Sequence, residues 1–445
     1  MRPKVHLLKL LVAAIVLSPF GCTSKRGPEF VSGKQTGLLV SAAQELVRSE
    51  LKSSFGTPTS LVAWQVLPVD YGVFEGKATK FNGQDLVVSL KGIGSNAADR
   101  RLSNLSGSVV TNEAGVAIGE VTHYSPSDGA MRLSNTGEAK IESDTTVRVI
   151  GDGLQFGRDL YLRHCMHCHG VSGDGDGPTA KYFAVKPRDY RRGTFKFTST
   201  VQGVRASRDD LKRIIKLGIP GTYMPSFMLL PDDEIVSLVE YIRWLSMRGE
   251  VENSLYIELS NDFSTEANKD KARAEFKKEV DNFAASQLPG KMSEIGRDLA
   301  ETWSASEDEA NLLLPKDARG NVDGDSIKRG RELFLNKDVG CFSCHGESGR
   351  GNGVSTETFN KLPNSTELSK VPGLFDDWGN LVKPRDLTTG IYRGGRRPLD
   401  IYRRIRAGIK GTPMQGFSRL EDQQVWDLTN YVLSIPFKAH SESKH

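Results

Sequence analysis

The amino-acid sequence contains one unit twice, and this repeat limits the possible fold more than any other feature. Each copy has, in the same order, a Gly-Arg-acid-Leu-aromatic-Leu run, a Cys-x-x-Cys-His pentapeptide and a Gly-x-x-Gly-Thr-x-Met loop. Because the three signals keep their order, the sequence predicts two domains of one fold. The signals stand at residues 157–162, 165–169 and 218–224 in the first copy and at 330–335, 341–345 and 408–414 in the second.

Each copy also ends in a helical pattern. Beyond each methionine, four apolar residues follow at spacings i, i+3, i+7 and i+10, which places them on one face of a helix. They are Ile235, Leu238, Ile242 and Leu245 in the first copy and Val425, Leu428, Val432 and Ile435 in the second. We predict that the later helix ends at Pro436, because proline has no backbone N–H with which to continue it.

The pentapeptides indicate covalent haem attachment. In this pattern two thiols bond to the haem vinyl groups, and the following histidine becomes the proximal ligand of the iron. A redox dithiol or half of a zinc site are alternatives, although the first does not require the histidine and the second needs four ligands. We predict two haem c groups per chain, attached by Cys165, Cys168, Cys341 and Cys344, with His169 and His345 as proximal ligands.

The iron also needs a distal ligand, which is normally Met or His in an electron-transfer protein. After His345 the sequence has a single methionine, Met414, and its histidines lie in a polar tail at 438–445. Met224 is the methionine of the first copy that aligns with Met414. We therefore predict Met224 and Met414 as distal ligands. With both axial positions filled, the iron carries electrons and offers no site to a substrate.

The order of elements in each copy resembles the small all-helical cytochrome c domain, over residues 151–249 and 326–437. The resemblance implies a mainly α protein, with a charged helical linker at 250–325 between the two domains. A Lys-Pro-Arg-Asp sequence recurs in both copies and contains Arg188 and Arg385. Arginine pairs well with carboxylates, so these two residues are predicted to hold haem propionates. A turn formed by the proline and aspartate is the alternative.

The N-terminal sequence predicts export. Residues 1–22 combine basic residues with an apolar stretch from Leu10 to Leu17, which is typical of a signal peptide. Cys22 follows Gly21 and resembles the lipidated cysteine of bacterial lipoproteins, whereas cleavage nearby or an uncleaved leader are the alternatives. Acyl chains on Cys22 would tether the protein to a membrane. We expect a periplasmic protein held at the membrane through its N-terminus.

The pattern of residues 30–150 predicts an N-terminal module. It has a short helix near 37–53 and β-rich sequence after it, including a turn at Asn82-Gly83. This region contains no cysteine and a single histidine, His123. Its predicted role is docking, shielding or structural support. The net charge of +4 is too small to argue for a nucleic-acid partner.

Together these features favour a dihaem c-type cytochrome that passes single electrons from a membrane or periplasmic donor to a terminal oxidase or reductase. A dihaem peroxidase-like enzyme is one alternative, and it would need an open distal position on one iron together with acid-base groups. A cytochrome subunit fixed in a respiratory complex is the other alternative, which differs in its partners and not in its chemistry.

Overall fold

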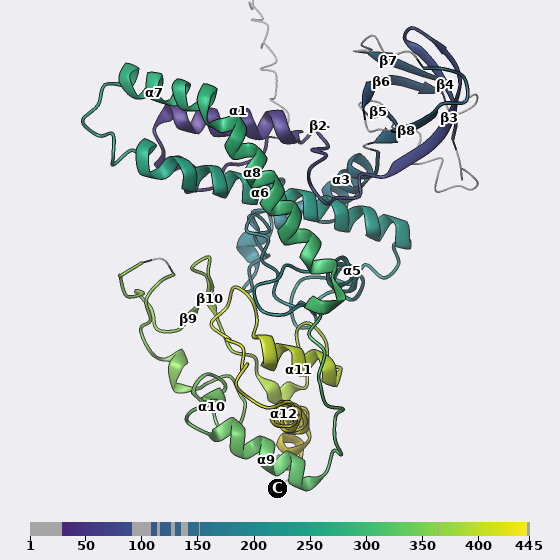
Figure 1. Ribbon diagram of the computed structural model, residues 1–445. Coiled ribbons are helices and arrows are strands. Elements are labelled where there is room, and N and C mark those ends of the chain that lie inside the picture. Colours follow the sequence, from purple (N-terminus) through teal and green to yellow (C-terminus); the bar gives the residue numbers. More distant parts are fainter. Residues whose placement is uncertain are drawn as a thin grey trace, which may run out of the picture.

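The computed structural model describes residues 29–90, 108–113, 116–125, 130–134, 141–150, 152–363 and 365–442. Within them the chain forms a small barrel, a helical body that contains the first copy of the repeat, and a second domain that contains the other copy (Figure 1). The predicted signal peptide, Cys22 and the last residues of the polar tail lie outside the described residues.

The expected β-rich module is a closed antiparallel barrel, which lies to one side of the helical body in Figure 1. Alternate residues face its interior: Val147 and Val149 are fully buried, whereas Arg148 points outward and pairs with Glu75 at 2.8 Å. The predicted Asn82-Gly83 turn joins the first two strands. The strands are β3 (Val73–Asn82), β4 (Asp85–Leu90), β5 (Val109–Asn112), β6 (Ala117–Ser125), β7 (Ala130–Ser134) and β8 (Thr146–Ile150), in the order β3-β4-β7-β6-β5-β8.

The first copy is organised around one long helix. Its closing helix, α6 (Asp232–Phe263), continues through the domain boundary that we expected at residue 249, and all residues from 241 to 252 are buried. A helix buried on every side lies inside a core. No helix in the described parts of the chain is both long enough and apolar enough to span a bilayer. The other elements of this copy are α3 (Asp152–His164), α4 (Met166–His169), η2 (Ala180–Tyr182) and α5 (Arg208–Leu217).

Segments outside the repeat surround α6. The Phe55 ring packs on Trp244 with centroids 5.4 Å apart, and the fully buried Trp303 lies 5.0 Å from the guanidinium of Arg243. The helices after residue 249, which we predicted to be a linker, therefore contribute to the core of the first domain. These segments are η1 (Thr36–Leu38), α1 (Ser41–Phe55), β1 (Gly56–Thr57), β2 (Ser60–Leu61), α7 (Arg273–Ser286), α8 (Leu288–Ser304), η3 (Ala305–Glu307) and η4 (Glu309–Asn311).

The second copy has a hydrophobic core of its own, in which Tyr402 packs on Trp426 at 4.5 Å. It is not entirely helical, because two short strands pair as a hairpin. Its elements are α9 (Gly324–Leu335), α10 (Cys341–His345), η5 (Val354–Thr356), β9 (Leu374–Phe375), β10 (Leu381–Val382), η6 (Leu387–Thr389), α11 (Pro398–Ala407) and α12 (Asp422–Glu442).

The prediction that the last helix ends at Pro436 is wrong, since α12 continues through this residue to Glu442. Proline cannot donate to the carbonyl four residues earlier, which belongs to Val432. The Tyr392 hydroxyl donates to that carbonyl oxygen at 2.8 Å. The acceptor left without its helical partner is therefore satisfied by a side chain from another segment, and the helix can proceed.

The two copies share one helix crossing. Helix α3 meets α6 at Gly157, and α9 meets α12 at Gly330. A Cβ at Gly157 would overlap the carbonyl oxygen of Ser237, and one at Gly330 would overlap that of Asp427. The glycine that opens the Gly-Arg-acid-Leu run thus allows two helix backbones to approach closely in both domains.

Candidate functional site

Each pentapeptide forms a short helical turn directly after the first helix of its copy, as α4 and α10. Within the described chain, the four cysteines of the two pentapeptides form no disulfide. Burial raises the pKa of Cys165 to about 12, with a smaller contribution from Cys168, and burial raises that of Cys341 to about 12 as well. A redox dithiol needs a thiol of lowered pKa. The surroundings of these thiols are therefore opposite to those of a thioredoxin-like site.

The pentapeptide histidines are oriented by the same hydrogen bond in both copies. His169 Nδ1 lies 3.2 Å from the carbonyl oxygen of Arg188, and His345 Nδ1 lies 3.2 Å from that of Arg385. When Nδ1–H donates to a carbonyl, Nε2 keeps its lone pair for a metal. Burial lowers the pKa of His169 to about 4 and also lowers that of His345. Both rings are thus neutral at neutral pH, the form that binds iron.

The Lys-Pro-Arg-Asp repeats supply these carbonyl groups. The sequence analysis assigned a role to the arginine side chains or, as the alternative, to a turn formed by the proline and aspartate, and it missed the backbone carbonyl. The aspartates form turns, as the alternative interpretation required: Asp189 accepts from the backbone N–H of Arg191 at 3.0 Å, and Asp386 accepts from that of Thr388 at 2.9 Å. The motif therefore fixes a carbonyl opposite each histidine through a short, hydrogen-bonded loop.

The two arginine side chains differ. Arg385 is half-buried and donates from Nε to the carbonyl oxygen of Ile391 at 2.7 Å. The guanidinium of Arg188 is buried, lies 3.9 Å from the ring centroid of Trp378, and has a pKa lowered by burial to about 10. Among the described residues, Arg188 Nη2, Trp378 Nε1 and Arg393 Nε are buried without a hydrogen-bond partner. Donors in this state fit a carboxylate-bearing group such as haem.

The methionine loops have the same hydrogen bonds in both copies. Ile219 N donates to Met224 O at 3.1 Å, and Ile409 N donates to Met414 O at 2.9 Å. The preceding threonine hydroxyl accepts from the methionine N–H in each loop, and both methionine side chains are half-buried. The loops are thus equivalent in conformation, and iron ligation by Met224 and Met414 stays a prediction.

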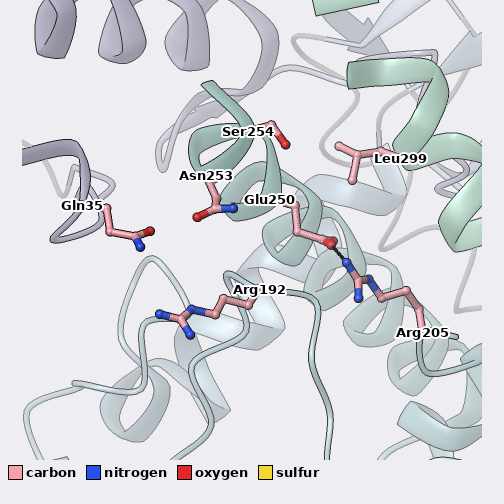
Figure 2. A pocket seen from close by; sticks show the side chains of 7 residues that line it. All are labelled: Gln35, Arg192, Arg205, Glu250, Asn253, Ser254 and Leu299. Atoms are coloured by element: carbon pink, nitrogen blue, oxygen red, sulfur yellow. Dashed lines mark hydrogen bonds and ion pairs between the residues drawn. The ribbon is translucent and has the colours of Figure 1, made fainter. Parts of the chain in front are cut away.

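A polar pocket of about 360 Å³ lies where α6 leaves the first copy, beside the N-terminal segment (Figure 2). Arg205 pairs there with Glu250, which also accepts from Trp303 Nε1 at 2.7 Å, and burial raises the pKa of Glu250. No sequence signal pointed to this pocket. The pocket is lined by Gln35, Arg192, Arg205, Glu250, Asn253, Ser254 and Leu299.

Comparisons with known proteins agree with the repeat. The Cytochrome c family model matches residues 154–246 and 327–436. No curated protein matches this chain. A similar solved structure is a chain of the "Kuenenia stuttgartiensis reducing HAO-like protein complex Kustc0457/Kustc0458", which is 25% identical and matches over 63% of this chain and 96% of that chain, with a TM-score of 0.44. At that TM-score the likeness gives no basis for assigning a function.

Proposed function

Because this chain carries two tandem cytochrome c domains, we propose that it is an exported dihaem c-type cytochrome that transfers single electrons between redox proteins. The observation that carries this proposal is the paired arrangement of each pentapeptide histidine with a backbone carbonyl at 3.2 Å. Two identical arrangements, each beside two thiols, favour one haem c per domain. Its iron would supply a one-electron change of oxidation state.

Different residues of the chain would attach the haem, orient the histidine and close the iron. Cys165 and Cys168 would hold one haem, and Cys341 and Cys344 would hold the other. The carbonyl of Arg188 or Arg385 keeps the histidine in the tautomer that binds iron through Nε2. Met224 and Met414 would supply the second ligand of each iron, which would exclude water, oxygen and peroxide from it.

The partners would be a membrane-bound or periplasmic electron donor and a terminal oxidase or reductase. Exposed apolar side chains near the Met224 loop support docking of a protein at the first domain, because solvated apolar groups that cluster on a surface mark interaction sites. Leu229 is 99% exposed, and Tyr223, Met228 and Leu217 are also exposed. Export and tethering would follow from the signal sequence and Cys22.

The test separates this carrier from a peroxidase-like enzyme. We expect the haem-loaded protein to show no steady turnover of hydrogen peroxide, because both irons have two protein ligands. Met224→Ala and Met414→Ala should each open one haem to peroxide. Met228→Ala, which removes an exposed methionine next to the first loop, is the matched control and should behave as wild type. Steady turnover of hydrogen peroxide by the wild-type protein would contradict the proposed electron carrier and support the peroxidase-like enzyme.

A further inference from the structure

Each of the two cytochrome c domains places one arginine against the methionine loop of the other domain. Gly221 and Gly411 occupy the same position in the two Gly-Thr-x-Met loops. A Cβ at Gly411 would lie 3.3 Å from Arg188 Nη1, and one at Gly221 would lie 3.3 Å from Nη1 and Nη2 of Arg385. Each Lys-Pro-Arg-Asp arginine therefore reaches the methionine loop of the other domain. An ion pair also joins the domains, between Arg213 and Asp400 at 3.4 Å.

The second domain adds a tryptophan to this boundary. Its connection between the pentapeptide and Lys-Pro-Arg-Asp is longer than that of the first domain and contains the β9–β10 hairpin, which extends toward the first domain in Figure 1. Trp378 lies at the hairpin turn, between Arg188 of the first domain and Gly411 of its own methionine loop. Arg192 of the first domain also contacts the hairpin, by donating to the carbonyl oxygen of Asp377 at 3.2 Å.

Cations collect around this tryptophan. The guanidinium of Arg188 lies 3.9 Å and that of Arg192 lies 5.5 Å from its ring centroid. Burial lowers the pKa of Lys196 to about 8, and the charge of Arg188 adds to the effect. The carboxylate of Asp376 lies among them but accepts from the backbone N–H groups of Trp378 and Asn380, at 3.1 and 2.9 Å. Buried cations are costly without a counter-charge. Asp376, Asp189 and Asp377 supply counter-charge to Arg188, so within the described chain the cluster lacks acceptors for its buried donors and not negative charge.

The unpartnered donors point to what completes the cluster. Arg188 Nη2 and Trp378 Nε1 are both buried and have no acceptor among the described residues. Leaving a buried donor unsatisfied is unfavourable, and an ionised acceptor gives the strongest compensation. Arg188 Nη1 and the six-membered ring of Trp378 lie against Gly411 in the methionine loop of the second domain. Gly411 stands three residues before Met414, the predicted ligand of the second haem.

We propose that Trp378 and Arg188 together bind a carboxylate of the haem attached at Cys341 and Cys344, so that a residue of the first domain serves the cofactor of the second. This proposal rests on the proposed function, since it requires haem at the second pentapeptide. It makes the domain boundary a shared cofactor site. The reduction potential of the second haem then depends on contact with the first domain.

The test uses Trp378→Phe in the full haem-loaded chain, because phenylalanine keeps a ring on Arg188 and removes the N–H. Both reduction potentials are measured by spectroelectrochemical titration, and the Met414→Ala variant identifies which potential belongs to the second haem. Loss of a donor leaves the carboxylate charge less compensated, which favours ferric iron. We expect the ferric–ferrous equilibrium of the second haem to shift by up to about tenfold, which corresponds to about 59 mV for one electron.

Controls keep the result specific. Trp426→Phe removes an indole N–H that donates to Asp317 O at 2.9 Å, in the segment before the second domain, and it should leave both potentials unchanged. Arg188→Gln should shift the reduction potential of the second haem further than Trp378→Phe does. Arg396→Gln removes an exposed charge of the same sign and should leave that potential unchanged. Two haems per chain with an unchanged second potential in both Trp378→Phe and Arg188→Gln would overturn the shared site. A wild-type chain without haem at the second pentapeptide would overturn the proposed function instead.

Discussion

The first cytochrome c domain is packed into a large shared core, whereas the second is built around a small core of its own. Helix α6 of the first domain is covered by α1, α7 and α8, which come from outside the repeat. Helix α12 of the second packs mainly on α9 and α11. His169 is accordingly buried, and the pentapeptide at 341–345 is half-buried. The same local signals thus build equivalent loops, and the surrounding segments decide how enclosed each one is.

The surfaces around the two methionine loops differ in how apolar their exposed side chains are. The first domain exposes large apolar side chains where the second has small, polar or charged ones. The aligned pairs are Leu217 and Ala407, Tyr223 and Pro413, Met228 and Ser418, and Leu229 and Arg419. This difference favours the first domain as the one that docks a redox partner.

The largest expected effect comes from removing one attachment site at a time. The double variants Cys165→Ala/Cys168→Ala and Cys341→Ala/Cys344→Ala should each bind one haem instead of two, because a single set of thiols remains. The haem content is measured by pyridine haemochrome absorbance. Cys22→Ala removes the cysteine outside the pentapeptides and should retain both haems. If either double variant kept two haems, the assignment of attachment sites would be wrong.

A buried ion pair tests the packing of the first domain. Arg205→Ala leaves Glu250 buried without its cation, and we expect the free energy of unfolding of this domain to fall by about 3 kcal/mol. Arg329→Ala breaks the pair with Asp427 in the second domain, where the arginine is 53% exposed, and should lower the free energy of unfolding much less. Denaturant unfolding compares the two variants. Equal losses would contradict the difference in enclosure.

The glycine crossings test whether the domains unfold separately. Gly157→Ala and Gly330→Ala each place a methyl group against a helix carbonyl, and each should lower the stability of its own domain by about 1–3 kcal/mol. Unfolding is followed by Trp fluorescence and by visible absorbance of the haems. A loss shared by both domains in both variants would show that the boundary joins them into one cooperative unit.

Acidification should weaken the second domain more than the first. Although burial opposes the effect, hydrogen bonds from Arg329, Ser326 and Gln423 lower the pKa of Asp427 below 3.8. The unfolded chain then binds a proton at higher pH than the folded one, so this contribution is present above about pH 4 and is lost as pH falls through the lowered value. Burial raises the pKa of Glu250, which gives the first domain the opposite dependence. Thermal unfolding between about pH 5 and pH 3 measures the difference, and Asp427→Asn should reduce the acid dependence of the second domain.

The repeat explains how much of this could be predicted. The pentapeptides, the methionine loops and the periodicity of the closing helices depend on residues close together in sequence, and the structure has helices and loops at those places. The course of α12 through Pro436 depends on Tyr392, which lies forty residues before Val432, the residue whose carbonyl it binds, and no sequence pattern connects the two. The continuation of α6 beyond 249 depends on packing by distant helices. Trp378 belongs to an insertion with no counterpart to align, so nothing in the sequence connected it with Arg188.

The central claim is that both irons are closed by two protein ligands, so that the protein carries electrons. Carbon monoxide binding to the dithionite-reduced, haem-loaded protein tests this claim most directly, since the gas binds ferrous haem only at an open axial position. We predict no change in the visible spectrum of the wild-type protein. Rapid binding at one haem per chain would contradict the account, because it would reveal an open iron on which an enzyme can act.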